Sequence, residues 1–182
     1  MMNKILLVCL LFNAGSSLTC KWMDRDFKLY SENSSLDQLN EMVNKYISSK
    51  GPDFEDVLSF PNKLYTRVSK APAEKRLTFV AQLLDEIVVL FEENQTCASW
   101  HESAVDDFLN VMTQQLHGLR SCVASQSLKR KNKKLSMYFK KLSKWLKQKG
   151  HSTGAWEWVH KEVKLHLYRA DLLVAFIAKK KH

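Results

Sequence analysis

Residues 154–177 read GAWEWVHKEVKLHLYRADLLVAFI, and this stretch decides the fold class. Apolar residues recur in it at intervals of three or four, which is the period of one face of an α-helix. The members of this row are Trp156, Val159, Val163, Leu167, Ala170, Val174 and Ile177. A second apolar row at Leu165, Leu172 and Phe176 predicts that the helix, capped by Ser152 or Thr153, lies deep in a bundle.

The same spacing predicts four more helices upstream of this one. Their apolar rows run from Leu36 to Tyr46, from Leu77 to Phe91, from Val105 to Val123 and from Leu135 to Trp145. Signals for helix ends support these spans, namely Gly51-Pro52, Pro72, a capping box at Ser99 to Glu102, and Gly150. The chain has only 5 Gly and 3 Pro and no alternating strand pattern, which argues against β-sandwich and Rossmann-type folds.

The connections between these helices predict how they are arranged. Short loops join the second helix to the third and the fourth, at about 131–149, to the fifth, so each pair should be antiparallel. The segment from Ser48 to Ala71 is interpreted as a long connection with a helical turn after Pro61. A loop of this length permits an overhand crossover between parallel helices. We therefore predict an all-α, up-up-down-down bundle of five main helices with a long first crossover loop.

The first residues have the layout of a secretory signal peptide. Lys4 precedes an apolar run from Ile5 to Phe12, and small residues follow as far as Thr19. The run is too short to span a bilayer, which takes about 20 residues. We expect cleavage after Thr19, a single domain over residues 20–182, and a secreted protein without membrane insertion. A buried N-terminal element and a cleavage site a few residues earlier remain as alternatives.

Cysteines and glycosylation sequons are the next features of the mature chain. Cys20, Cys97 and Cys122 would remain after cleavage, and they allow three different single bridges. Asn33 and Asn94 each begin an N-glycosylation sequon, a signal that depends on exposure. No Cys-x-x-Cys or His-x-x-x-His pattern occurs, so we predict neither a metal site nor a cofactor.

Three stretches together resemble type I interferons, and in particular those of fish. They are residues 79–91, residues 99–123 and residues 154–162, the last being similar to the Ala-Trp-Glu-x-Val-Arg/His signature of that family. The resemblance implies a helical class II cytokine that defends against viruses. It further implies that the cytokine brings two class II receptor chains together and so triggers kinase-coupled induction of antiviral genes. No enzymatic signature accompanies it, and we expect a monomer that is not an enzyme.

The resemblance also implies a disulfide pairing. Cys20 and Cys122 match the two cysteines that are bridged in this family. Many members have a second bridge that uses the residue just before Ala-Trp-Glu, but that residue is Gly154 here. The chain therefore resembles the two-cysteine group, in which Cys97 has no counterpart and could be a free thiol, an adduct or a dimer contact.

By the same resemblance, two surfaces of the bundle are expected to meet receptor chains. The high-affinity chain would meet the last helix at His160, Lys161 and Lys164, and the first long loop at Lys50 and Asp53. We expect the three helical residues, together with His166, to share the polar side of the last helix. The second chain would meet residues of the second and third helices, namely Val88, Val89, Glu93, Ala104, Leu109 and Thr113. Trp156 is expected in the core, while Trp158 could be core or exposed anchor.

The formal charge of +9 is concentrated in one segment. Ten Lys or Arg and no acidic residue lie between Lys129 and Lys149. This run favours a solvated outer face over a specific glycosaminoglycan site. Nucleic acid is not expected as a partner, because the aromatic residues in the run are spaced to point inward. The alternative function that follows from the charge is a cationic secreted protein binding anionic membranes or glycosaminoglycans.

Overall fold

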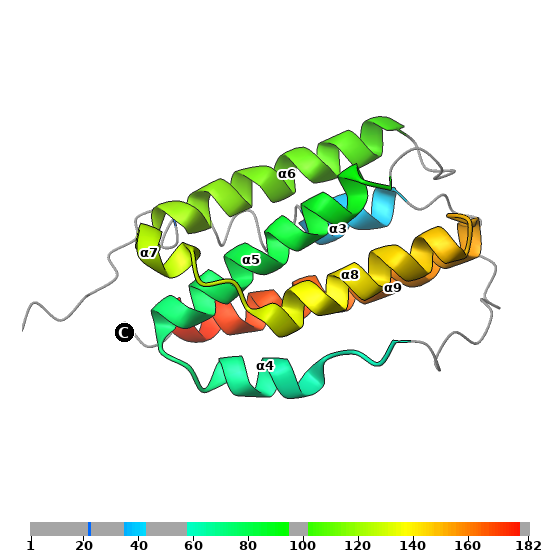
Figure 1. Cartoon of the computed structure of the whole chain (residues 1–182). Coiled ribbons are helices and arrows are strands. Elements are labelled where there is room, and N and C mark those ends of the chain that lie inside the picture. Colours follow the sequence, from blue (N-terminus) through cyan, green and yellow to red (C-terminus); the bar gives the residue numbers. More distant parts are fainter. Residues whose placement is uncertain (1–21, 23–34, 43–57, 95–101, 179–182) are drawn as a thin grey trace, which may run out of the picture.

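The computed structural model describes residues 22, 35–42, 58–94 and 102–178, and all the regular secondary structure in these ranges is helical. Figure 1 shows the helices as an elongated bundle. In chain order they are α3 (Ser35–Glu41), α4 (Asn62–Ser69), α5 (Ala73–Glu92), α6 (Glu102–Ser121), α7 (Ser125–Leu128), α8 (Lys133–Gln148) and α9 (Thr153–Ala178). The all-helical prediction is confirmed. Within the described ranges, no helix is both long and apolar enough to cross a membrane.

Helices α5 and α6 are antiparallel neighbours, as the sequence predicted. Phe91 near the end of α5 contacts Phe108 near the start of α6, with ring centroids 5.2 Å apart. Arg120, which lies later in α6 than Phe108, forms an ion pair at 2.8 Å with Asp85, which lies earlier in α5 than Phe91. Contacts that move forward along one helix and backward along the other define an antiparallel arrangement.

Helix α8 runs parallel to α5, and α9 returns antiparallel to α8 (Figure 1). The parallel direction follows from two contacts, since Gln82 bonds to Ser136 and Asn94 to Ser143 further along both helices. Gly150, at φ 60°, ends α8 in the left-handed conformation that glycine adopts without strain. Its N–H donates to the carbonyl of Lys147, so the predicted role of this glycine is confirmed.

The core lies between α5, α6 and α9 and is built on aromatic rings. Trp156 of α9 is 1% exposed, and its ring lies 5.5 Å from that of Phe91. Phe91 in turn packs on Phe108. The main apolar row of α9, which includes Val163 and Val174, is buried along its length. The predicted core position of Trp156 is therefore confirmed, and Trp158 is partly buried against Trp145 at 4.9 Å.

Helix α4 is a correction to the predicted connection between Ser48 and Ala71. Instead of a single turn after Pro61, residues 62–69 form a helix of eight residues. Leu64, Tyr65 and Val68 are buried against α5 and α9, so tertiary contact stabilises a helix too short to stand alone. The fourth predicted helix begins two residues later than expected, because the Asn132 side chain caps α8.

Trp22 ties the start of the chain to α6. A Cβ atom on Gly118 would lie 2.0 Å from Cε2 of the Trp22 ring, so the ring lies directly on the glycine. Cys122, one turn further along, is disulfide-bonded. The other three cysteines lie outside the described residues, and the pairing of Cys122 with Cys20 therefore stays a prediction. The contact at Gly118 supports it, because Trp22 follows Cys20 by only two positions.

Candidate functional site

The side of α9 that faces away from α5 exposes three large apolar side chains. Leu165, Tyr168 and Leu172 are 36%, 55% and 37% exposed. Their spacing of three and four places them on one face of the helix. The prediction that Leu165 and Leu172 lie inside the bundle is wrong, since no described helix covers this strip. Exposed apolar side chains that gather on one face are typical of a protein-interaction site.

Two lysines extend the same strip toward the start of α9. Lys161 and Lys164 are exposed, as the sequence predicted. The ammonium group of Lys164 donates a hydrogen bond to Oδ1 of Asn40 in α3, at 3.0 Å. We call the surface formed by Lys161, Lys164, Leu165, Tyr168 and Leu172 the α9 outer face.

His160 does not belong to the α9 outer face, which corrects the prediction that it shares the polar side with the lysines. It is only 7% exposed, and its Nε2 lies 3.0 Å from the carbonyl oxygen of Leu39. Because a carbonyl oxygen only accepts, Nε2–H is the donor. Burial lowers the pKa of His160, which keeps the ring neutral at pH 7. Its role here is to fix α3 on the flank of α9.

His166 is fully buried, although it was expected beside the lysines. Its Nδ1 lies 2.5 Å from the Tyr65 hydroxyl oxygen of α4. Four rings from α4, α8 and the segment before α4 surround it, those of Phe60, Tyr65, Tyr138 and Phe139. Burial lowers the pKa of His166 to about 3, so it is neutral at physiological pH. The contact with Tyr65 fixes α4 on the other flank of α9.

The second predicted surface is partly exposed. Val89 is 41% exposed, and Glu93 and Thr113 are also exposed, while Ala104 and Leu109 are half-buried. Val88 is buried in the core, so its placement on an accessible face is wrong. The reason is that α6, α8 and α9 all pack on α5, which leaves only a narrow strip of that helix in contact with solvent.

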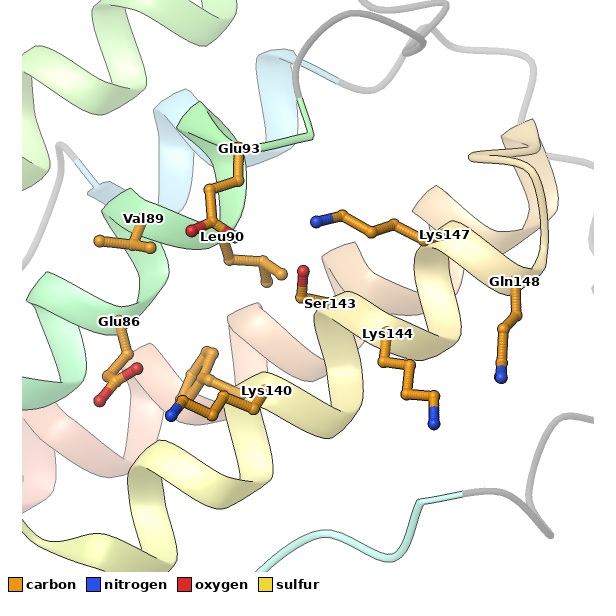
Figure 2. A pocket seen from close by; sticks show the side chains of 10 residues that line it. Glu86, Val89, Leu90, Glu93, Lys140, Ser143, Lys144, Lys147 and Gln148 are labelled. Carbon is orange, nitrogen blue, oxygen red and sulfur yellow. The ribbon is translucent and has the colours of Figure 1, made fainter.

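A groove of about 550 Å³ separates this strip of α5 from α8 (Figure 2). Glu86, Val89 and Glu93 line it on the α5 side. The α8 side presents three lysines and two uncharged polar residues, namely Lys140, Lys144, Lys147, Ser143 and Gln148.

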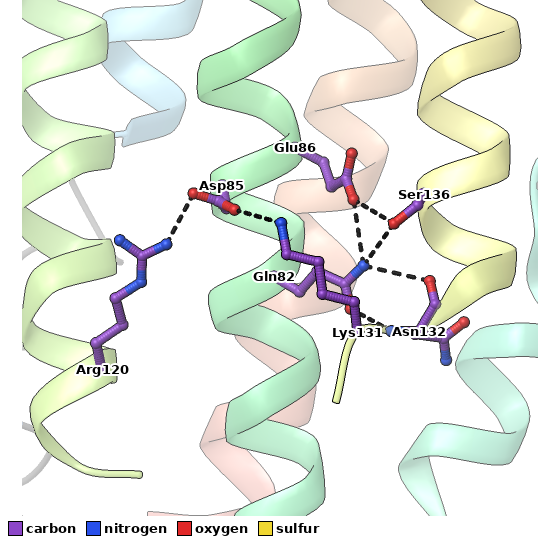
Figure 3. A network of polar contacts seen from close by, with 7 residues as sticks. All are labelled: Gln82, Asp85, Glu86, Arg120, Lys131, Asn132 and Ser136. Carbon is purple, nitrogen blue, oxygen red and sulfur yellow. Dashed lines mark hydrogen bonds and ion pairs between the residues drawn. The ribbon is translucent and has the colours of Figure 1, made fainter. Parts of the chain in front are cut away.

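The start of α8 is held on α5 by a polar network that sequence reasoning missed (Figure 3). The buried Gln82 side chain accepts from the backbone N–H of Asn132 at 2.6 Å and donates to the Ser136 hydroxyl at 3.0 Å. Nearby, Asp85 pairs with both Arg120 and Lys131, at 2.8 and 3.4 Å. A glutamine within an apolar helical face was the only sequence signal for this network.

Asn94 is buried, which contradicts its candidacy for glycosylation. Its Nδ2, the atom to which an N-linked glycan is attached, donates to the carbonyl of Leu90 at 2.7 Å. Its Oδ1 lies 3.0 Å from Nε2 of His151, so the side chain joins the end of α5 to the α8–α9 turn. The remaining predicted site residues, Cys20, Asn33, Lys50 and Asp53, lie outside the described residues.

Comparison with known proteins places the chain and its fold in a family. Residues 19–176 match the interferon alpha/beta domain. Interferon a3 of Oncorhynchus mykiss is 35% identical over 158 residues, which are 86% of this chain and 85% of that protein. Interferon omega-1 of Bos taurus is 25% identical over 166 residues, covering 86% and 83%. The solved structure of zebrafish interferon 1 superposes with a TM-score of 0.69 at 30% identity, covering 86% of this chain and 98% of that one.

The described helices form a bundle of the kind found in helical cytokines. The chain belongs to the interferon alpha/beta family. The trout and zebrafish proteins support the fish type of type I interferon that the sequence resembled. Secretion, antiviral defence and innate immunity follow from membership of this family.

Proposed function

We propose that this interferon acts by holding two class II cytokine receptor chains together, which triggers kinase-coupled induction of antiviral genes. The α9 outer face binds the high-affinity chain, and the exposed strip of α5 with Thr113 of α6 binds the second. The observation that carries the proposal is the side-by-side exposure of Leu165, Tyr168 and Leu172 on a helix whose opposite side is core.

The α9 outer face has the composition of a binding surface with an apolar centre and a charged rim. Tyrosine and leucine side chains bury large apolar areas when a partner covers them. Lys161 and Lys164 lie at the edge, where cations steer an acidic partner. The surface is also preorganised, because His160 holds α3 on one flank and His166 holds α4 on the other. Preorganisation lowers the entropy cost of binding. Lys50 and Asp53, which lie outside the described residues, remain candidates for contact with the same chain.

The two surfaces point away from each other, which is what a ligand for two receptor chains requires. The inner row of α9, including Trp156, packs on Phe91 of α5. The α9 outer face and the solvent-facing strip at Val89 therefore lie on opposite sides of that contact. A chain bound to one surface leaves the other accessible.

The test measures complex formation with purified receptor ectodomains and induction of antiviral genes in cells. The protein should bind one chain alone and then recruit the second. A Val89→Ala/Thr113→Ala variant should keep the first step and weaken the second, because both changes lie on the α5–α6 surface. Removal of either receptor gene from the cells should abolish induction. Induction that survives the loss of either chain would overturn the proposal.

A further inference from the structure

Helix α8 carries a high positive charge that does not contribute to its stability. Six of its sixteen residues are lysine and none is acidic. Lys133 and Lys134 lie in the first turn, where the helix dipole favours acidic residues. Lys140 and Lys144 are four positions apart, a spacing at which like charges repel. These lysines therefore destabilise α8 slightly, and their presence calls for a function outside the fold.

All six lysines are exposed, and none forms an ion pair with any residue in the part of the chain that the structure describes. The contrast is with Lys131, just before α8, which shares the carboxylate of Asp85 with Arg120. The charge of α8 is consequently available to an external anion.

Four of the lysines form a line along one edge of α8. Lys133, Lys140, Lys144 and Lys147 are seven, four and three positions apart, so they fall on one side of the helix. The line is about 21 Å long at 1.5 Å per residue. The last three lysines border the groove between α5 and α8, where Ser143 and Gln148 add polar side chains (Figure 2). We call this line the α8 lysine edge.

We propose that the α8 lysine edge is a binding site for a sulfated glycosaminoglycan. A linear polyanion matches a straight row of unpaired ammonium groups, because successive sulfates meet successive lysines and release bound counterions. The polysaccharide lies along the α8 lysine edge and not deep in the groove, since Glu86 and Glu93 on the opposite wall repel sulfate. A secreted protein meets such polysaccharides at the cell surface. The proposal does not depend on which receptor chains bind.

The residues around the edge argue against other polyanions. Membrane-surface helices need an apolar face toward the lipid, but Met137 is the one large apolar side chain of α8 that is exposed. Single-stranded nucleic acid is held by stacking on exposed aromatic rings. The aromatic residues of α8, namely Tyr138, Phe139 and Trp145, are all buried.

The test compares two variants that lose the same charge from different places. One replaces Lys133, Lys140, Lys144 and Lys147 by Gln, and the other replaces Lys63, Arg67, Lys70 and Lys75, which are exposed on α4 and the start of α5. Binding of each purified protein to immobilised heparin is measured between 0.1 and 0.5 M NaCl. The α8 variant should bind about tenfold more weakly or worse and show a shallower dependence on salt, while the matched variant stays close to the wild type.

Additional controls exclude unfolding and binding that does not depend on charge as explanations. A variant with Arg at the same four α8 positions should keep heparin binding, and circular dichroism should show unchanged helix content in all variants. Desulfated heparin should not bind. Equal losses in the two Gln variants would overturn the proposal, because they would indicate net charge without a site. Tighter binding to phosphatidylserine vesicles or to single-stranded nucleic acid than to heparin would overturn it as well.

Discussion

On α9, the inner side that packs in the bundle and the outer side that faces solvent differ from the sides that the sequence predicts, because several residues lie on the opposite one. His160 and Lys161 are neighbours in the chain and were expected on one polar side, yet the histidine is buried and the lysine is exposed. Leu165 was expected inside and is exposed, whereas His166, the next residue, is fully buried. Consecutive helical residues point about 100° apart, so each of these pairs straddles the boundary between core and solvent.

These differences between predicted and observed burial show that neighbouring helices, and not side-chain polarity, decide which parts of α9 are covered. Helix α3 lies on one flank and provides the Leu39 carbonyl that satisfies His160. Helix α4 lies on the other flank, and its Tyr65 hydroxyl is hydrogen-bonded to Nδ1 of His166, whose Nε2 has no partner among the described residues. No described helix covers Leu165 or Leu172. A buried polar group is tolerated when it is hydrogen-bonded, and an apolar group stays exposed when nothing packs on it.

The largest expected difference between the two sides of α9 is in stability. Trp156→Ala removes a ring that is 1% exposed and packed on Phe91, so unfolding should become easier by about 3–5 kcal/mol. Leu172→Ala on the outer side should cost about 0.5 kcal/mol or less. Urea unfolding followed by circular dichroism measures both values. Similar losses would mean that the two sides of α9 do not differ in burial.

The sequence predicts most of this bundle because apolar spacing is a local property. Four of the five predicted helices correspond to the long helices α5, α6, α8 and α9, and Gly150 and Pro72 mark ends close to those observed. The first predicted helix is described only as α3, since Val43 and Tyr46 lie outside the described residues. Helix α4 was predicted only as a helical turn after Pro61, because two turns offer too few positions for a periodic signal and its stability comes from contacts with α5 and α9.

The candidate site was less predictable, because exposure depends on packing between distant segments. Lys161 and Lys164 are exposed as expected, while His160, Val88 and Asn94 were expected at accessible positions and are buried. His160 contacts Leu39 and Asn94 contacts His151, both far away in the sequence, and Val88 lies among the helices that pack on α5. In the sequence, Leu165 and Leu172 of the α9 outer face form part of a second apolar row. Such a row fits the core of a bundle as well as it fits a binding interface.

The next largest effect should be on receptor binding. Leu165→Ala/Tyr168→Ala removes the apolar centre of the α9 outer face, and binding of the high-affinity chain should weaken by about 100-fold, as for central anchors of other interfaces. Stability should change little, because both side chains are exposed. Surface plasmon resonance with the receptor ectodomain measures the affinity. Met137→Ala, which removes an exposed apolar side chain from α8, is the matched control and should leave this binding unchanged.

Acid should lower the stability of the fold through the two buried histidines on the inner side of α9. Burial lowers the pKa of His166 to about 3 and lowers that of His160, so the unfolded chain binds more protons than the folded one below pH 6.5. The contribution of His166 to stability is therefore full above pH 6.5 and falls as the pH is lowered toward 3, by up to about 1.4 kcal/mol per pH unit, and His160 acts in the same direction.

Urea titrations at pH 7, 6 and 5 test this slope. His166→Phe removes one titrating group, and although it changes the stability at pH 7, it should flatten the decline between pH 6 and 5. A His117→Phe change is the comparison, since it makes the same substitution at an exposed position. An unchanged slope in His166→Phe would show that this ring is not held neutral by the fold.

The smallest expected effect concerns the charged edge of the α9 outer face. Lys161→Ala/Lys164→Ala should weaken binding of the high-affinity chain by about fivefold at low salt, chiefly through slower association, because exposed cations steer an acidic partner more than they hold it. The loss should shrink at 0.5 M NaCl, where such charges are screened within a few ångströms. The helical fold should remain intact, since Lys164 contributes only a surface hydrogen bond to Asn40. Unchanged association at low salt, with unchanged gene induction, would show that the receptor does not meet this charged edge.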